Sequence, residues 1–318
     1  MKTSCVVGIL FLLLIFYVVS NTAWVHHGPS LYGRDVVGHM QLVEKFYYRI
    51  GDIVHGTDSL PAKAVNILSL LHEDSLPFHG TYMWPKLVHL SATIPCFVFG
   101  LRPMVMIQFN LLFFGILITS VYFIGKRCHS SSAGLFAAVL VSLYPAIWGQ
   151  TRKFGLDFPV TAMTSLAIAV LVYTDHFRRR GRSLLLGAAI GLGILTKGQI
   201  VLYLGGPLLI DLCVGLRRGR AHRRARVVNF IFVNLLALLI SSPWWWGIAL
   251  DLWRVYFGVV TDYPFSWAYA YKKQTPFTAG WFLFHLVHVF ISMGLLYAFV
   301  FVLSLPAYVR SRSGHKIV

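Results

Sequence analysis

Residues 178–226 read RRRGRSLLLGAAIGLGILTKGQIVLYLGGPLLIDLCVGLRRGRAHRRAR, two apolar runs enclosed by clusters of arginine. The runs, 183–197 and 199–216, are separated only by Lys197-Gly198, which predicts a tight helical hairpin or one broken pair of helices. Charged side chains are costly inside a bilayer. Arginine clusters that alternate with apolar runs are therefore typical of a multi-pass membrane protein.

The same pattern extends along the chain, whose 318 residues are 57% hydrophobic and only 12% charged. Soluble domains carry about 25% charged residues, so this composition excludes a water-soluble globular protein. Eight apolar runs are candidates for transmembrane helices: 5–24, 103–125, 133–149, 157–174, 183–197, 199–216, 227–248 and 279–304. We expect an all-α integral membrane fold, with residues 1–318 forming a single multi-pass transmembrane domain.

The basic residues lie mostly in every second gap between these runs. With the N-terminus in the cytoplasm, the cytoplasmic segments hold 16 of 28 basic and two of 11 acidic residues. Their net charge is +14, against +3 for the outer segments, and the positive-inside rule favours this orientation. Short basic loops of this kind contact anionic membrane lipids, and we do not expect nucleic acid as a partner.

The first outer loop, residues 25–86, is the longest and holds six of the 11 acidic residues. Residues 36–50 and 61–71 have helical spacing, and we expect two juxtamembrane helices there that lie on the membrane surface. The apolar stretch 87–99 is too short to span comfortably, so we expect it in the outer interface or re-entering it. No clear cleavage site follows residues 5–24, which are expected to remain as the first helix.

Most polar groups suited to chemistry lie at the predicted outer interface. Asp35 opens the first loop helix and Asp157 opens a span, but each aspartate is equally explained as an N-cap. Lys197 is equally explained as a lysine that extends from a helix end toward water. The first loop contributes four candidates for binding an acceptor or a metal ion: His39, Glu73, Asp74 and His79. Whether a divalent metal ion is used stays open.

Several segments, in a fixed order, carry a resemblance to a known family: 33–40, 84–100, 134–138, 143–145, 152–159 and 187–197. In them the chain resembles the membrane-embedded, polyprenyl-phosphate-dependent glycosyltransferases of the GT-C type. These include the protein O-mannosyltransferases and the lipid A aminoarabinose transferases. The resemblance extends over about residues 1–250.

The resemblance implies transfer of a sugar from dolichyl or undecaprenyl phosphate to a lipid, glycan or protein acceptor. It assigns the base or acceptor-orienting role to Asp35, with Asp157 as the second catalytic candidate. It assigns the donor phosphate to Lys86, Arg152 and Lys197. This fits the chemistry, because a carboxylate can deprotonate the acceptor and cations can stabilise the departing phosphate. We expect the plasma (inner) membrane of a prokaryote, with the site on the non-cytoplasmic side.

The chain departs from the family at some positions. Gly38 stands where the aminoarabinose transferases have an arginine, and Lys86 follows its proline instead of preceding it. The family usually has more spans, so a short member, a fragment and a degenerate copy all stay open. Two other functions also stay open: an inactive scaffold or partner subunit of the same fold, and a lipid or sugar transporter. Transporters often place ionisable groups at mid-membrane, whereas here they gather at the outer interface, which favours the enzyme.

Overall fold

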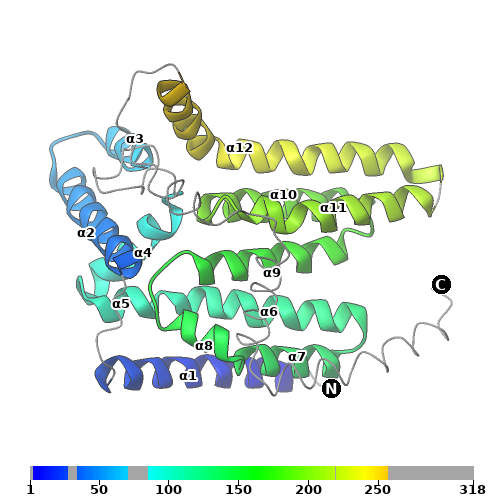
Figure 1. The fold of residues 1–318 in the computed structure, drawn as a ribbon, viewed down its shortest axis with the longest axis horizontal. Coiled ribbons are helices and arrows are strands. Elements are labelled where there is room, and N and C mark those ends of the chain that lie inside the picture. Colours follow the sequence, from blue (N-terminus) through cyan, green and yellow to red (C-terminus); the bar gives the residue numbers. More distant parts are fainter. Residues whose placement is uncertain (1–2, 28–33, 71–84, 219, 257–318) are drawn as a thin grey trace, which may run out of the picture.

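A computed structural model describes residues 3–27, 34–70, 85–218 and 220–256, and every regular element in these ranges is a helix (Figure 1). In chain order they are α1 (Thr3–His27), α2 (Arg34–His55), α3 (Leu60–Ser69), α4 (Leu87–Phe99), α5 (Pro103–Gln108), α6 (Asn110–Cys128), α7 (Ser131–Ser142), α8 (Pro145–Thr151), α9 (Asp157–Tyr173), α10 (Arg180–Thr196), α11 (Ile200–Arg217), a 3-10 turn (Arg220–His222) and α12 (Arg223–Tyr256). The expectation of an all-α fold is confirmed for the described residues.

Four stretches of these helices are long and apolar enough to cross a membrane: Ser4–His26, Pro103–Cys128, Ile200–Arg217 and Arg223–Trp245. The pair α7 and α8, bent by 60°, adds a fifth if the two helices form one span. Helices α9 and α10 have 17 residues each and run beside them (Figure 1). The chain is therefore an integral membrane protein. The number of eight spans stays a prediction, and residues 279–304 lie outside the described ranges.

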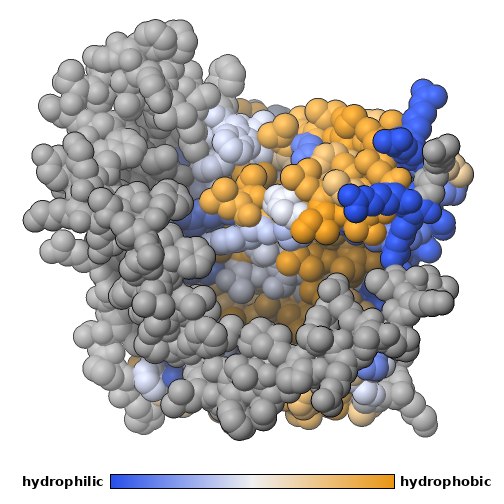
Figure 2. Space-filling model, turned by 45° about the vertical axis from the view of Figure 1, so that its right-hand side comes forward, coloured by the Kyte–Doolittle hydropathy of each residue, from blue (hydrophilic) through white to orange (hydrophobic). Residues whose placement is uncertain are grey.

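The long helices lie side by side, and α2, α3 and α4 lie at one end of this bundle (Figure 1). Helix α10 packs against both α9 and α12, and α6 packs against α7 and α9. Leu117 and Leu186 are among the side chains buried in the shared core. Other large apolar side chains, such as Phe11 and Leu202, point outward, and apolar surface occupies the middle of the molecule (Figure 2). Such a surface suits a surrounding of lipid.

Glycines allow α10 and α12 to approach each other closely. A Cβ atom on Gly187 would lie 2.8 Å from the Val233 carbonyl oxygen, and one on Gly191 would lie 2.7 Å from the Ile240 Cβ. Small residues four positions apart let helices in membranes pack backbone against backbone. Part of the segment 187–197, which carries the family resemblance, therefore serves helix packing.

Charged residues separate to opposite ends of the bundle. The arginine end consists of the turns at residues 126–130, 174–182 and 217–226, and hydrophilic residues gather at the right-hand edge of Figure 2. The polar end consists of the first turns of α2 and α4 together with residues 151–157 and 196–200 (Figure 1). The alternation predicted from the sequence thus exists in space, while the side of the membrane that each end faces stays a prediction.

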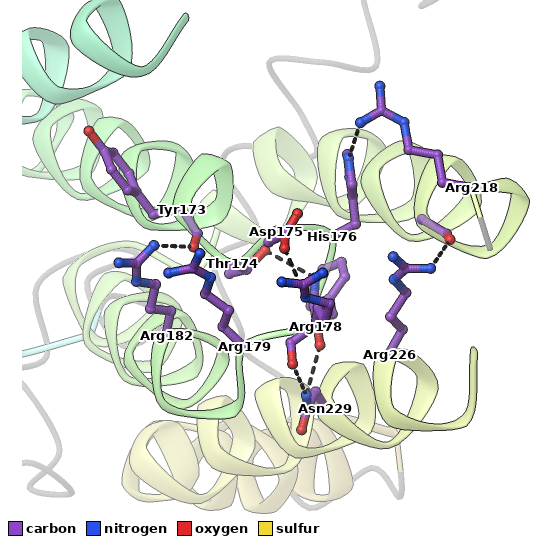
Figure 3. Close-up of polar contacts among 12 residues, drawn as sticks. Tyr173, Thr174, Asp175, His176, Arg178, Arg179, Arg182, Arg218, Arg226 and Asn229 are labelled. Atoms are coloured by element: carbon purple, nitrogen blue, oxygen red, sulfur yellow. Dashed lines mark hydrogen bonds and ion pairs between the residues drawn. The ribbon is translucent and has the colours of Figure 1, made fainter. Parts of the chain in front are cut away.

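Figure 3 shows the turn between α9 and α10 at the arginine end. Asp175, His176 and Phe177 have φ angles of 58°, 53° and 61°, in the left-handed region that L residues rarely adopt. The Phe177 amide donates to the Thr174 hydroxyl at 3.1 Å, and the Asn229 amide donates to the Phe177 carbonyl at 2.7 Å. Such strain persists only where the surroundings fix the backbone, as these bonds do here.

The same turn is tied to α11 through His176. Arg218 Nη1 donates to His176 Nε2 at 3.0 Å (Figure 3). His176 Nδ1 lies 2.7 Å from Asp211 Oδ1. Since an arginine can only donate, Nε2 accepts, and the proton on Nδ1 is donated to the carboxylate. Asp211 therefore has a structural partner within the arginine end.

Candidate functional site

The polar end is organised by two parallel helices, α2 and α4. Nδ1 of His39 lies 2.8 Å from Nε2 of His89, and the rings of Tyr47 and Phe97 stack with centroids 4.5 Å apart. From the first contact to the second, the chain moves eight residues toward the C-terminus in α2 and also in α4. The two helices are therefore parallel, and their first turns lie together. Asp35 is the second residue of α2, and its backbone is therefore close to the beginning of α4.

The beginning of α4 combines a buried ammonium with a buried imidazole. Lys86, which directly precedes the helix, is 7% exposed, and His89, one turn later, is 0% exposed. The pKa of His89 lies well below its usual range, first because burial disfavours the charged ring and then because of the charges of His39 and Lys86. A lysine is almost never buried without a specific reason, which makes this position a candidate functional site.

The loop after α8 is held against the core by three side chains that share one acceptor. The Tyr17 hydroxyl and the Asn21 and Asn110 amides donate to the Thr151 carbonyl at 3.3, 3.4 and 3.1 Å. Asn110 also donates to the Lys153 carbonyl at 2.9 Å. These bonds fix where the chain leaves α8, and thereby fix the residues that follow.

Those following residues lie directly against the two histidines. The ring of Phe154 meets His89 edge to face at a centroid distance of 6.2 Å. A Cβ atom on Gly155 would lie 3.6 Å from His39 Cδ2, so the backbone here approaches the imidazole closely. The loop therefore joins α2 and α4 at one site and brings the beginning of α9 to it.

Arg152 is held by aromatic rings. Its guanidinium carbon lies 4.1 Å from the ring centroid of Trp24 and 4.9 Å from that of Trp148, and Nη2 donates to the Ser20 hydroxyl at 3.4 Å. Partial burial lowers the pKa of Arg152 from its usual value, but an arginine stays charged. The structure thus places this cation at the polar end, on the side of α1. Its predicted contact with a donor phosphate stays a prediction.

Asp157 and Lys197 form an ion pair with a hydrogen bond from the ammonium to Oδ1. The Asp157 side chain is 65% exposed and that of Lys197 is 21% exposed. Asp157 is the first residue of α9, and the N-cap position is Leu156, which has no side-chain capping bond. The alternative explanation of Asp157 as an N-cap is therefore wrong, because its carboxylate binds the lysine.

The turn that carries Lys197 is fixed by a glycine. A Cβ atom on Gly198 would lie 2.2 Å from the Trp244 ring, so only a residue without a side chain admits the indole of α12 at this point. Lys197 has extended backbone angles, φ −160° and ψ 120°, between the end of α10 and the beginning of α11. The predicted tight hairpin is confirmed, and its tip presents the lysine to the polar end.

The structure brings six of the nominated residues, or their backbone, to this end. They are Asp35, His39, Lys86, Arg152, Asp157 and Lys197, whereas Glu73, Asp74 and His79 lie outside the described residues. The described residues contain no group of three histidine, cysteine, aspartate or glutamate side chains that could hold a metal ion. Sequence reasoning missed His89, although a histidine in a 13-residue apolar helix was a usable signal.

Helix termini contribute to the electrostatics of the polar end, where the C-termini of α8 and α10 oppose the N-termini of the other helices. The first turns of α2, α4, α9 and α11 all lie here (Figure 1). The N-terminus of each helix carries roughly half a positive charge and unsatisfied amide groups. Amide groups of these first turns, Lys86 and Lys197 are therefore present at one end of the bundle, an arrangement that suits an anionic group such as a phosphate.

These features define a class: a helical integral membrane protein with a cationic polar site at one end of its bundle. The dolichyl-phosphate-mannose-protein mannosyltransferase family model matches residues 85–246, about half of the chain. The chain belongs to this family, which confirms the resemblance seen in the sequence. The matched segment contains Lys86, His89, Asp157 and Lys197, whereas Asp35 precedes it.

Relatives among characterised proteins agree with this assignment. The chain is 33% identical over 144 residues to an undecaprenyl phosphate-alpha-4-amino-4-deoxy-L-arabinose arabinosyl transferase of Pseudomonas paraeruginosa, strain DSM 24068 / PA7. It is also 33% identical over 144 residues to the transferase of the same name of Pseudomonas aeruginosa, strain UCBPP-PA14. Each match covers 43% of this chain and 26% of the relative.

Proposed function

We propose that the protein transfers a sugar from a polyprenyl-phosphate donor to an acceptor at the polar end. The observation that carries this proposal is the junction of α2, α4, α9 and α11, where Lys86 directly precedes α4 and Lys197 lies in the turn between α10 and α11. A lipid-linked phosphate is an anionic group at the end of an apolar chain. It requires cations at the membrane boundary and apolar helices beside them, and the polar end offers both.

In the proposed reaction the acceptor hydroxyl attacks the anomeric carbon of the donor sugar. The acceptor loses its proton to a carboxylate, for which Asp35 is the first candidate, and the bond between the anomeric carbon and the phosphate oxygen breaks. The lipid phosphate leaves with the bonding electrons. Lys86 and Lys197 stabilise the negative charge that develops on it, more effectively in a partly buried site than in water.

Asp157 has a different proposed role from Asp35. Its carboxylate is bound to Lys197, so it orients the ammonium and balances its charge before the donor arrives. The proposed location is the plasma membrane, with the polar end on the non-cytoplasmic side, because the arginine end then faces the cytoplasm. The proposal names the class of donor and leaves the sugar and the acceptor to the assay, which must therefore test several of each.

The proposal is tested by transfer of radiolabelled sugar from dolichyl and undecaprenyl phosphates in membranes. Asp35→Asn keeps the size of the side chain and its ability to form hydrogen bonds but removes the proton acceptor. We expect transfer to fall by about 10²–10⁴-fold, the usual contribution of general acid–base catalysis, with unchanged expression and donor binding. Asp52→Asn, the same change at an exposed position of α2, is the matched control and should transfer normally.

Two results would contradict the proposal at different levels. Normal transfer by Asp35→Asn would leave that aspartate with a structural role only, in the first turn of α2, and move the search for the base to Glu73, Asp74 and Asp157. Absence of transfer by the wild-type protein from every donor tested would instead favour a scaffold or partner subunit of the same fold.

A further inference from the structure

The two buried histidines between α2 and α4 have no role in the proposed chemistry, yet they lie one turn from Asp35 and Lys86, which do. His39 is 6% exposed and His89 is 0% exposed, and their rings stack with centroids 5.0 Å apart and an interplanar angle of 28°. We propose that His89 is a positioning residue: through its hydrogen bond with His39 it holds the first turn of α2, with Asp35, against the beginning of α4. This inference rests on the proposed glycosyl transfer.

The spacing along the helices supports this assignment. Asp35 and His39 are four residues apart on α2, so they share one face of that helix. Lys86 and His89 are three residues apart at the beginning of α4. The hydrogen bond between the histidines therefore joins the turn with the proposed base to the turn with the proposed phosphate ligand.

A second contact between α2 and α4 provides a built-in comparison. Tyr47 and Phe97 stack about two helical turns further on, so the helices are joined at both places. The imidazole contact is at the end where Asp35 and Lys86 lie, and the aromatic contact is remote from them. If the histidines merely joined the helices, loss of either contact would have similar consequences.

The polar character of the contact is costly, which argues against a purely structural purpose. Nδ1 of His89 is buried and has no hydrogen-bond partner among the described residues. A buried polar atom without a partner costs about 1–3 kcal/mol, whereas apolar side chains of similar shape would pack at this position without that cost. Selection for stability alone would favour the apolar pair, while a directional bond fixes the distance and angle between the helices.

Two conservative variants separate these explanations because they mimic different ring nitrogens. His89→Gln can place an amide group near the position of Nε2, which faces His39, and can keep the bond. His89→Asn places its amide near the position of Nδ1 and loses the bond. Phe97→Leu removes the remote aromatic stack and is the matched control.

Steady-state transfer is measured for purified full-length protein with a polyprenyl-phosphate sugar. We expect His89→Asn to lower kcat by about 10–100-fold with little change in the donor KM, since small misplacement of a catalytic group has effects of this size. His89→Gln should restore most of kcat, and Phe97→Leu should stay near wild type. Equal losses in His89→Gln and His89→Asn, or equal losses in His89→Asn and Phe97→Leu, would overturn the positioning role.

A second measurement does not depend on transfer. Spin labels at Val37, which is exposed, and Ser91, which is half-buried, report the separation of α2 and α4 near the histidines in a protein without native cysteines. Labels at Tyr48 and Val98 report the remote contact. His89→Asn should broaden only the first distance distribution. An unchanged distance distribution in His89→Asn overturns the positioning role, even if the wild-type protein is an active transferase. If the distribution broadens as expected but the wild-type protein is inactive, only the proposed function is overturned.

Discussion

The polar end and the arginine end use charge in opposite ways. At the arginine end, cations are numerous and mostly exposed, and the contacts in Figure 3 are made largely to backbone carbonyls and to neighbouring side chains of the same turn. At the polar end, charged groups are fewer, but Lys86 is 7% exposed and stands beside a fully buried His89. A buried cation occurs at both ends, since Arg226 at the arginine end is 6% exposed and donates to the Gly215 carbonyl. The number of charges therefore marks topology, whereas a buried lysine next to a fully buried histidine distinguishes the candidate site.

The two ends also differ in which unfavourable feature each contains and in whether hydrogen bonds compensate it. The left-handed turn at Asp175, His176 and Phe177 is costly, but hydrogen bonds to the Thr174 hydroxyl and from the Asn229 amide fix it. The polar end has regular helices and instead holds a buried nitrogen without a partner among the described residues, Nδ1 of His89. Substitutions at the two ends should therefore have different signatures, stability at one and transfer at the other.

The first test of the difference between the two ends is the side of the membrane that each one faces. Here the expected difference in labelling is all or none. In a protein without its native cysteines, a cysteine at Ser59 should react with a membrane-impermeant maleimide in intact cells. A cysteine at Ala221 should react only after the cells are permeabilised, because the positive-inside rule places the arginine end in the cytoplasm. The reverse pattern would contradict both the orientation and the assignment of the site to the outer face.

The next largest effect is expected on donor binding. Lys197→Ala removes a cation that we assign to the donor phosphate, and loss of one charge-assisted hydrogen bond costs about 1.5–3 kcal/mol, or roughly 10–150-fold in affinity. The fold should survive, because the ion pair with Asp157 is partly exposed and contributes little to stability. Binding of a labelled polyprenyl phosphate to purified protein measures the effect.

Arg182→Ala at the arginine end is the matched control for this measurement. Arg182 donates to the Tyr173 carbonyl at 3.0 Å and lies at the opposite end of the bundle from the proposed donor site. Its removal should leave donor affinity unchanged. Equal weakening in both variants would show that the lipid responds to net charge alone, and unchanged affinity in Lys197→Ala would remove this lysine from the site.

The sequence predicted the helices more completely than it predicted the site. Apolar runs and helical spacing predicted α2 and α3 inside the long loop and α4 directly after it, although α2 extends from Arg34 to His55, beyond the expected 36–50. Local pattern also predicted the hairpin at Lys197-Gly198, because two apolar runs with a single charged residue between them have few other arrangements. These properties depend on neighbouring residues, so a single sequence is sufficient.

Contacts between distant segments were not predicted in the same way. The bond between His39 and His89 joins residues 50 positions apart, and its existence depends on how two helices are packed. Asp157 had two equally good explanations in the sequence, and only the position of Lys197, 40 residues later, decides against the cap. Residue type and spacing specify which groups are available, while the packing of helices specifies which of them meet.

A moderate loss of stability, without loss of transfer, is expected at the arginine end. Asp211→Ala removes the acceptor of the His176 Nδ1–H bond and leaves a partly buried donor without it. We expect the free energy of unfolding to fall by about 1–3 kcal/mol, and transfer per folded molecule to stay normal. Thermal unfolding in detergent and the transfer assay together measure this. A selective loss of transfer in a stable protein would show that the arginine end takes part in the reaction.

The smallest effect is a dependence of stability on pH at the polar end. Burial, followed by the charges of His39 and Lys86, lowers the pKa of His89 in the folded protein, while an unfolded histidine titrates near 6.5. As the pH falls below about 6.5, the unfolded chain binds the proton first, so stability decreases by up to about 1.4 kcal/mol per pH unit. Above that pH both states hold the ring uncharged, and this contribution to the pH dependence vanishes.

His89→Gln should remove this acid sensitivity while keeping the contact with His39. Melting temperatures of the wild type and the variant in detergent, compared at about pH 7.5 and about pH 5.5, measure the difference on either side of the usual histidine pKa. The wild type should lose more stability than the variant on acidification. An identical loss in both proteins would mean that His89 takes up no proton on unfolding, which is incompatible with a ring held uncharged by burial beside Lys86.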